Sequence, residues 1–153
     1  MTLRAEPARP HDLQDALDLL RRCELPEHGV AERWGHYFVV REDDGRVVGT
    51  GGLEVHGTDG LLRSVGVEAD YRGQGLGVKL VEAVVERATQ LDLRAVYLLT
   101  TTARDFFARR RFADSPRDEA PAPIRESWEF RTGCPATAVL MKRDLPRPRG
   151  TGG

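Results

Sequence analysis

Apolar positions recur with two different periods along this chain, and the order of those periods predicts a fold that mixes strands and helices. A first strand is expected over residues 2–5. Asp12 is a residue type that caps a helix, and the helix after it is expected to end near Cys23. A short helix is expected around residues 30–34. The apolar face of the longer helix consists of Leu13, Ala16, Leu17, Leu19 and Leu20.

Three strands in an antiparallel meander are predicted next. Residues 37–41 are rich in aromatic and β-branched side chains, which favour strands. Asp43-Asp44-Gly45 supplies a hairpin turn. The return strand covers residues 46–55, where glycines at 49, 51 and 52 suggest a bulge. A second turn at Thr58-Asp59-Gly60 leads into a strand over residues 61–67.

The second half of the chain predicts a parallel crossover. A helical apolar face begins at Leu76 and ends near Leu91, and the nearly continuous apolar run at residues 94–100 is typical of a buried strand. Strand, helix and strand in this order form a crossover unit. The remaining expected elements are a short helix over 103–110, an extended piece from Phe112, a short helix from Pro123 through Phe130 and a closing strand over 136–141.

Together these elements predict an α/β fold (α+β, with a mixed sheet) that has six or seven strands and helices on both faces of the sheet. We expect one domain over residues 1–145 and a flexible tail over residues 146–153, which are rich in proline, arginine and glycine. The net charge of −1 gives no reason to expect nucleic acid or a membrane surface as a partner. Cys23 and Cys134 are too few for a disulfide scaffold, and the first residues lack the apolar core of a signal peptide, so a cytoplasmic location is expected.

The run Arg72-Gly73-Gln74-Gly75-Leu76-Gly77 lies between a predicted strand and a predicted helix. Glycines in such a turn let backbone N–H groups crowd around an anion, and the helix N-terminus adds further donors. The dinucleotide fingerprint fails because its last glycine would fall on Val78 or Leu80. The ATP and GTP loop fails because no hydroxyl residue follows Lys79. The turn therefore predicts a pyrophosphate site of another kind.

The turn does match the pattern R/Q-x-x-G-x-G/A, through Arg72, Gly75 and Gly77. In this pattern the chain resembles the GNAT superfamily of N-acetyltransferases, whose members bind acetyl-coenzyme A there. The resemblance covers residues 1 to about 145. It implies the superfamily's acyl-coenzyme A N-acyltransferase fold, acetyl-coenzyme A as cosubstrate and no metal. The implied pyrophosphate contacts are Arg72, Gly73, Gln74, Gly75, Leu76, Gly77 and Val78.

The resemblance also implies a bulge in the strand before this turn, which splays from its parallel neighbour. The backbone of Val65, Gly66 and Val67 would then pair with the pantetheine arm like an added strand. A backbone N–H of Val65 or Gly66 is the expected donor to the thioester carbonyl, where it would stabilise the developing oxyanion. Arg72 is expected either to contact phosphate or to close the loop.

A second segment, residues 103–112, resembles the superfamily pattern A-x-x-F-Y-x-x-x-G-F. Phe107 stands where many members have a tyrosine that protonates the departing thiolate, and Arg111 replaces a glycine, so we expect that turn to differ. Both Phe106 and Phe107 are assigned to the cosubstrate site, with Phe106 in the core and Phe107 beside the sulfur. The three hydroxyls before this segment are assigned to substrate (Thr100), to pantetheine (Thr101) and to catalysis (Thr102), with helix capping by Thr102 as the alternative.

At a finer level the chain resembles the arsenic-resistance N-acetyltransferases, through Leu62-Arg63-Ser64-Val65, the run from 97 to 103, Asp105-Phe106-Phe107-Ala108-Arg109 and Cys134-Pro135-Ala136. This resemblance implies acetylation of a small amino-acid analogue that carries an arsenic- or phosphorus-containing acid group. A fork-shaped cation suits such a group, so Arg63 is the expected substrate clamp and Ser64 a second substrate contact. Arg104 and Arg125 are weaker candidates.

The attacking amine must be neutral, so a base or a water relay is expected. Glu54 is the first candidate base, and His56, Glu27 and His28 are others. Trp34, Tyr37 and Trp128 could wall the acceptor pocket. Two other functions stay open: acetylation of a protein N-terminus or lysine, and acyl-coenzyme A binding without catalysis, which the phenylalanine at 107 favours. A homodimer is expected from the family.

Overall fold

The computed structural model describes residues 3–146, which form two compact units. Unit 1 comprises residues 3–54 together with Leu62–Glu86, and unit 2 comprises Val55–Leu61 together with residues 87–146. Strands pair in the order β1-β2-β3-β4-β5-β7-β6, which makes a mixed sheet of seven strands. The predicted fold class and strand number are therefore confirmed. The expected tail lies outside the described residues apart from Pro146, and the boundary at 145 stays a prediction.

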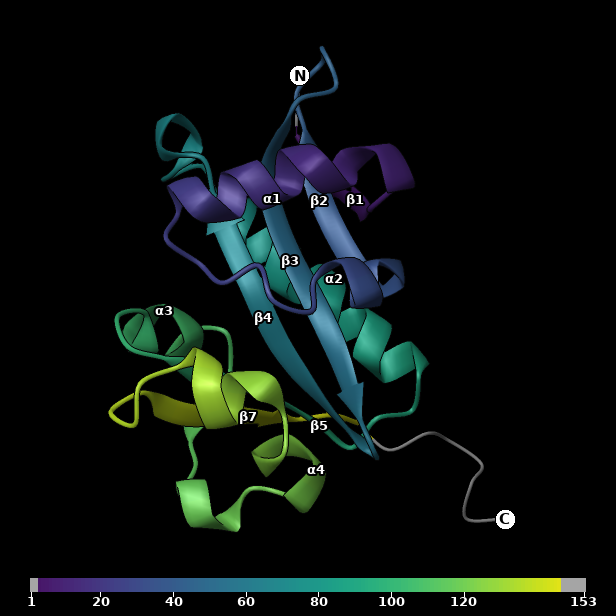
Figure 1. Ribbon diagram of the computed structural model, residues 1–153. Coiled ribbons are helices and arrows are strands. Elements are labelled where there is room, and N and C mark those ends of the chain that lie inside the picture. The colour runs from purple at the N-terminus through teal and green to yellow at the C-terminus, as the bar shows by residue number, and fades with distance from the viewer. Residues whose placement is uncertain (1–2, 147–153) are drawn as a thin grey trace. The chain divides into compact units, whose positions relative to one another are not determined.

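Unit 1 carries the first helix and the antiparallel meander in the predicted order (Figure 1). Its strands begin with β1, which pairs Ala5 with Val40, and continue with β2, which pairs Tyr37 with Gly52. The bounds are β1 Ala5–Pro7, η1 Pro10–Asp12, α1 Leu13–Arg22, η2 Ala31–His36, β2 Tyr37–Arg41, β3 Val47–His56, β4 Asp59–Val67, η3 Ala69–Tyr71 and α2 Leu76–Gln90; the ends of β3 and α2 and the start of β4 belong to unit 2.

Helices cover both faces of the strands in unit 1 (Figure 1). On one face, Ala16 and Leu19 of α1 pack against Val39 and Val47 in a core cluster. On the other face, the glycines at 49 and 51 lie against Leu80 of α2. Val47 and the two glycines are all odd-numbered yet face opposite sides, because one extra residue of β3 interrupts its register with β2 between positions 47 and 49. The predicted bulge is thus present, and the glycines at 49 and 51 serve close packing against α2.

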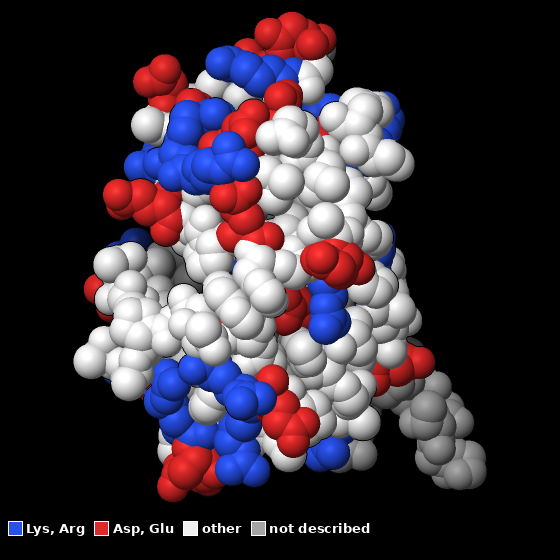
Figure 2. Space-filling model, viewed as in Figure 1, with Lys and Arg blue, Asp and Glu red and all other residues white. Residues whose placement is uncertain are grey.

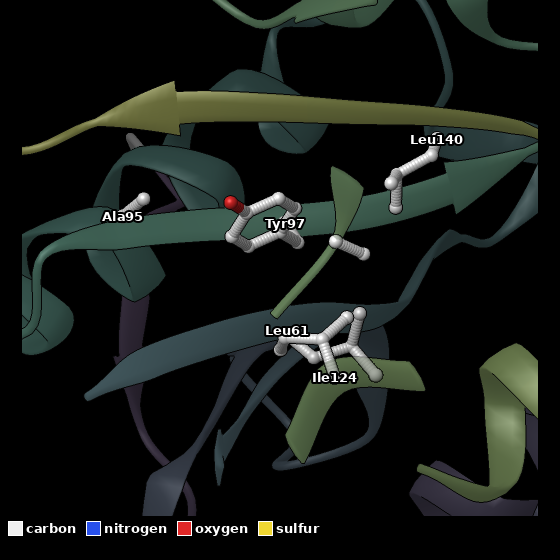
Figure 3. Packing of buried hydrophobic residues seen from close by; sticks show 6 residues of the cluster. Leu61, Ala95, Tyr97, Ile124 and Leu140 are labelled. Atoms are coloured by element: carbon white, nitrogen blue, oxygen red, sulfur yellow. The ribbon is translucent and has the colours of Figure 1, made fainter. Parts of the chain in front are cut away.

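Unit 2 contains the start of β4, the parallel strand β5 and the closing strands, whereas most of the crossover helix α2 belongs to unit 1. β5 pairs in parallel with β4 through Gly60 and Leu61, and β7 pairs antiparallel with β5 along its full length. Buried side chains of this unit form the cluster in Figure 3: Leu61, Ala95, Tyr97, Ala120, Ile124 and Leu140. The bounds are β5 Ala95–Thr100, α3 Arg104–Ala108, β6 Ala113–Asp114, η4 Arg117–Glu119, α4 Ala122–Arg125, the π-helical turn η5 Glu129–Gly133 and β7 Val139–Asp144.

Several predicted boundaries are wrong. The first strand is β1 rather than residues 2–5, and Thr2 lies outside the described residues. The second hairpin turn includes Gly57, whose φ of 66° is one that glycine adopts without strain. β4 therefore starts at Asp59, two residues before the predicted start at Leu61. The closing strand starts at Val139 instead of the predicted residue 136, because the N–H of Ala138 donates to Pro135 O in a turn. None of the helices within residues 3–146 is long and apolar enough to cross a membrane.

Asp12 precedes α1 as predicted, but its carboxylate does not cap that helix. Asp12 Oδ2 instead accepts the N–H of Arg9 at 2.8 Å and Nη2 of Arg41 at 2.6 Å. Burial opposes ionisation of Asp12, yet these hydrogen bonds and the Arg41 charge lower its pKa below the ordinary value. The carboxylate therefore ties the start of α1 to β2.

Candidate functional site

The glycine-rich turn of unit 1 has the geometry of an anion-binding loop. The α-carbons of Gly73 and Gly75 have φ angles of 83° and 79°, which L side chains rarely adopt. A Cβ on either glycine would meet no heavy atom within 4 Å, so the space beside both is open. Left-handed residues at alternate positions gather successive N–H groups on one side of a turn. The 15-residue helix α2 begins at Leu76, which adds its N-terminal donors to the same loop.

Arg72, the first residue of this turn, is bonded back to the end of β4. Its Nε donates to Val67 O at 3.0 Å, and its Nη2 lies 3.9 Å from Sγ of Cys23. The bond to Val67 O spans the segment between β4 and the turn, and the two roles expected for Arg72, a phosphate contact or closure of the loop, stay predictions. The Cys23 thiol also points at Val67 O, at 3.8 Å. The carbonyl of Val67 therefore already accepts donors from within the chain.

Strand β4 is irregular just before this turn. Ser64 has a φ of 63°, far from extended geometry, although it is buried and is not glycine. Its carbonyl accepts Oγ1 of Thr50 at 2.7 Å, and its hydroxyl lies 2.8 Å from the hydroxyl of Tyr37. Gly66 follows, and a Cβ there would lie 3.2 Å from Sγ of Cys23. The irregularity predicted for this strand is thus centred on Ser64, and Gly66 lets the end of α1 approach.

Arg63 and Glu54 form a buried ion pair on the α1 side of the strands. Nη1 of Arg63 lies 2.8 Å from Oε2 of Glu54, and their side chains are 1% and 6% exposed. A Cβ on Gly29 would lie 3.5 Å from the same Nη1, so the loop after α1 covers the pair. The predicted substrate clamp and the predicted base are therefore bonded to each other.

The residues predicted to wall the acceptor pocket belong to different units. In unit 1, the rings of Trp34 and Tyr37 stack with centroids 5.2 Å apart. Glu27, one of the alternative bases, is paired with Arg21 at 2.9 Å on the surface. In unit 2, the ring of Trp128 occupies the space where Gly133 would carry a Cβ. The structure thus brings Trp34 and Tyr37 together, with the Tyr37 hydroxyl at Ser64, and gives Trp128 a packing role in its own unit.

In unit 2, the three hydroxyls at and after the end of β5 do not cap helix α3, which was the alternative predicted for Thr102. Thr100 Oγ1 accepts the N–H of Ala103 at 3.0 Å, whereas Thr101 and Thr102 are exposed. Ala103 is the N-cap of α3, and no side chain caps this helix. The hydroxyls of Thr101 and Thr102 are therefore on the surface, and that of Thr100 shapes the turn.

Of the aromatic pair in α3, Phe107 is the buried residue, although Phe106 was predicted to lie in the core. Phe107 is 8% exposed and meets both Phe106 and Phe112 edge to face, whereas Phe106 is partly exposed under the guanidinium of Arg110. Arg111 has a φ of 72°, a conformation that glycine favours, so this residue is strained. The expected difference between this turn and that of the superfamily stays a prediction.

A model of the family described as "Acetyltransferase (GNAT) family" matches residues 3–114 of this sequence. That match covers well over half of the chain and includes the turn, β4 and the ion pair. The chain belongs to the GNAT acetyltransferase family. Known proteins similar to this GNAT chain include the amino-acid acetyltransferases of Aeromonas salmonicida (28% identical over 143 residues, 84% of this chain and 32% of the relative) and Pseudomonas putida (33% over 104 residues, 67% and 24%). The chain spans about a quarter to a third of the length of these relatives.

Solved structures show the same GNAT fold. N-acetylglutamate synthase from Neisseria gonorrhoeae, complexed with coenzyme A and N-acetyl-glutamate, has a TM-score of 0.83 at 18% identity and covers 96% of this chain and 36% of its own. Rv2747 from Mycobacterium tuberculosis, in complex with CoA and NLQ, has a TM-score of 0.81 at 25% identity and covers 93% and 99%. The ribosomal-protein-S18-alanine N-acetyltransferase from Escherichia coli has a TM-score of 0.74 at 17% identity and covers 98% of each chain.

Sequence reasoning missed a pocket beside the GNAT turn, of about 350 Å³. It is lined by Leu3, Glu42, Asp43, Tyr71, Gln74, Leu76 and Lys79. A hydrogen bond to Glu42 raises the pKa of Tyr71 above its ordinary value, and Nζ of Lys79 donates to Leu3 O at 2.6 Å. The residues come from the N-terminal segment, the β2–β3 turn, η3, the glycine-rich turn and α2, so no local sequence pattern could have grouped them. Within residues 3–146 there is no cluster of three or more His, Cys, Asp or Glu side chains that could hold a metal.

The GNAT chain carries its charges in mixed order over the face that Figure 2 shows. Lysine and arginine side chains alternate there with aspartate and glutamate, in keeping with the net charge of −1. No broad surface of one sign lies over this face.

Proposed function

We propose that this chain transfers the acetyl group of acetyl-coenzyme A to the α-amine of a small amino acid. The observation that carries the proposal is the turn at Gly73 and Gly75, which opens N–H groups to an anion directly after the irregular strand β4. Membership of the GNAT family supports acetyl-coenzyme A as the cosubstrate. Support for an amino acid comes from relatives that bear the name amino-acid acetyltransferase.

The residues of unit 1 fit the diphosphate of coenzyme A. Open space beside Gly73 and Gly75 leaves room for phosphate oxygens at van der Waals distance from the backbone. We assign the diphosphate to the amides from Gly73 to Val78, and the pantetheine arm to the backbone of Val65 and Gly66. Because Val67 O already accepts Arg72 Nε, it is the poorer partner for the arm. Thr101, Phe106 and Phe107 stay proposed cosubstrate contacts from the family resemblance.

Acetyl transfer needs a neutral amine, a stabilised carbonyl oxygen and a tolerable leaving group. A backbone N–H of Val65 or Gly66 would donate to that oxygen as negative charge develops on it, an effect worth about 3 kcal/mol in other acyl-transfer enzymes. The amine proton would leave through Glu54 or through water, and Thr102 stays a proposed participant. Because Phe107 has no hydroxyl, the thiolate would take its proton from solvent. Free thiols have a pKa near 8.5, so this thiolate leaves readily.

Arg63 is the proposed partner for a carboxylate of the acceptor. It lies on the α1 face of unit 1, and Glu54 and the loop at Gly29 hold its guanidinium in place. Ser64 and Thr100 remain proposed substrate contacts. A narrower form of the proposal names glutamate-like acceptors that carry an arsenic- or phosphorus-containing acid group. The N-acetyl-glutamate in the complex of the Neisseria gonorrhoeae protein supports a glutamate-like shape.

Release of free thiol from acetyl-coenzyme A tests the proposal. Purified protein is given the twenty standard L-amino acids, phosphinothricin (a phosphorus-containing glutamate analogue), an arsenic-containing glutamate analogue and a short peptide with a free N-terminus. We expect release with at least one amino acid and none with the peptide. Release with the peptide alone would replace the proposal with protein N-terminal acetylation. Thermal stabilisation by acetyl-coenzyme A without release from any amine would replace it with an acyl-coenzyme A binding module.

A further inference from the structure

Ser64 is held in a conformation that its own chemistry disfavours. It is the residue of β4 with a φ of 63°, it carries a Cβ, and it is 7% exposed. A left-handed residue with a Cβ costs free energy in a strand, and such strain persists only where the surroundings fix it. The strain lies one residue before Val65, one of the two backbone donors proposed for the thioester carbonyl.

Two buried hydroxyls fix Ser64. Oγ1 of Thr50 donates to Ser64 O at 2.7 Å, and the hydroxyl of Tyr37 lies 2.8 Å from Oγ of Ser64. Thr50 and Tyr37 are 0% and 1% exposed. The Tyr37 ring lies directly over Gly52, where a Cβ would overlap it, so the ring is held against β3. Thr50 comes from β3, the strand beside β4, and Tyr37 comes from β2, the strand beyond β3.

The bond from Thr50 also sets the direction of the next N–H. Ser64 C=O and Val65 N–H belong to one peptide group, and no peptide bond of the described chain is cis. In a trans peptide these two bonds point in opposite directions. Because the Ser64 carbonyl points at the Thr50 hydroxyl, the Val65 N–H points away from that hydroxyl. A thioester oxygen on that side of β4 would accept this N–H.

We propose that Thr50 and Tyr37 are positioning residues that hold the Ser64–Val65 peptide so that Val65, rather than Gly66, donates to the thioester oxygen. This inference rests on the acetyl transfer proposed above. An N–H aimed in advance at the developing charge stabilises the transition state, while cosubstrate binding depends on the turn at Gly73 and Gly75. Loss of the Thr50 hydroxyl therefore lowers kcat and leaves coenzyme A affinity nearly unchanged.

The test compares Thr50→Val, which keeps the shape but loses the donor, with Thr50→Ser, which keeps the donor. Ser127→Ala is the matched control, because Oγ of Ser127 also donates to a backbone carbonyl in a buried place, at 2.7 Å, but in unit 2. Thiol release gives kcat and the acetyl-coenzyme A KM, with the amino acid that the unaltered protein acetylates fastest as acceptor. Calorimetry with coenzyme A gives the Kd. All of these measurements are made below the melting temperature of each variant.

We expect Thr50→Val to lower kcat about tenfold or more, with the Kd of coenzyme A and the acetyl-coenzyme A KM within about twofold of the unaltered protein. Thr50→Ser should restore most of kcat, and Ser127→Ala should lose stability without losing kcat. A kcat for Thr50→Val within about twofold of the unaltered protein would overturn the inference. Should Thr50→Val not fold, Tyr37→Phe replaces it, and an unchanged kcat there would have the same meaning. If the unaltered protein acetylates no amine, the proposed function itself fails, which is a different result from an active protein that is indifferent to Thr50→Val.

Discussion

The buried pair of Arg63 and Glu54 allows the fold and the acceptor site to be tested separately. Arg63→Met keeps an unbranched apolar stem but removes the cation that lies 2.8 Å from the Glu54 carboxylate, which is 6% exposed. Removing one partner of a buried pair costs about 3–5 kcal/mol. For a chain of this size each kcal/mol shifts the melting temperature by about 2–4 °C, so the melting temperature should fall by roughly 6–20 °C.

The double variant Glu54→Leu/Arg63→Met removes both charges and replaces them with apolar groups. Replacing a buried pair in this way is often neutral or stabilising. The double variant should therefore recover most of the stability that Arg63→Met loses. It should not recover acceptor binding, because the guanidinium that we assign to the carboxylate is still missing.

Urea unfolding of the three proteins gives the stabilities, and thiol release gives the KM of the acceptor and of acetyl-coenzyme A. We expect the acceptor KM of the double variant to rise at least about tenfold, since hydrogen bonds to charged groups contribute about 1.5–3 kcal/mol. The acetyl-coenzyme A KM should stay nearly unchanged. An Arg63→Met protein as stable as the original would refute the energetic reasoning. Equal increases in the two KM values would refute the role of Arg63 as an acceptor clamp.

Three further predictions concern stability and pH. Arg111→Gly should raise the free energy of unfolding by about 0.5–1 kcal/mol, measured in urea, because glycine adopts the φ of 72° without strain; a lower stability would contradict the assignment of strain. Asp12→Asn should destabilise the protein most at neutral pH. Folding lowers the pKa of Asp12, so the carboxylate contributes to the free energy of unfolding above its unfolded pKa of about 3.9. That contribution is lost as the pH falls through the folded pKa, and the unfolding curves of the two proteins should converge in acid. A difference in stability that does not change with pH would be the contrary result. Gly52→Ala should destabilise by about 1–3 kcal/mol, because its methyl group would overlap the Tyr37 ring, and a neutral effect in thermal unfolding would show that the ring moves freely.

Local chemistry explains which parts of this structure could be predicted. The helices and strands follow from apolar periodicity, and the turn at Gly73 and Gly75 follows from its glycines, since φ angles near 80° require them. The closing strand was misplaced because Ala136-Thr137-Ala138 is apolar enough for a strand, whereas the N–H of Ala138 is used in a turn. The left-handed conformation of Arg111 could not be predicted from its residue type, because tertiary packing can hold a non-glycine residue in that conformation.

The site was predicted residue by residue but not as a set of contacts. Arg63 and Glu54 were both chosen from sequence, yet their pairing depends on the register of two strands and could not be read from spacing. Nothing local marks Ser64 as the strained position, because serine is not a residue that such a φ selects. Thr50 carries no motif at all, and its importance comes only from the carbonyl that lies beside it.

The central claim is that backbone amides of the glycine-rich turn bind the diphosphate of coenzyme A. Gly75→Glu places a carboxylate at that turn, and Gly45→Glu is its matched control, since Gly45 also has a positive φ, of 90°, and open space beside it, but lies in the β2–β3 turn. The measurement is the Kd of coenzyme A by calorimetry for both variants and the unaltered protein. A charge repulsion on the order of 4 kcal/mol predicts at least about 100-fold weaker binding for Gly75→Glu, with Gly45→Glu close to the unaltered protein. Equal affinity in all three proteins would contradict the account.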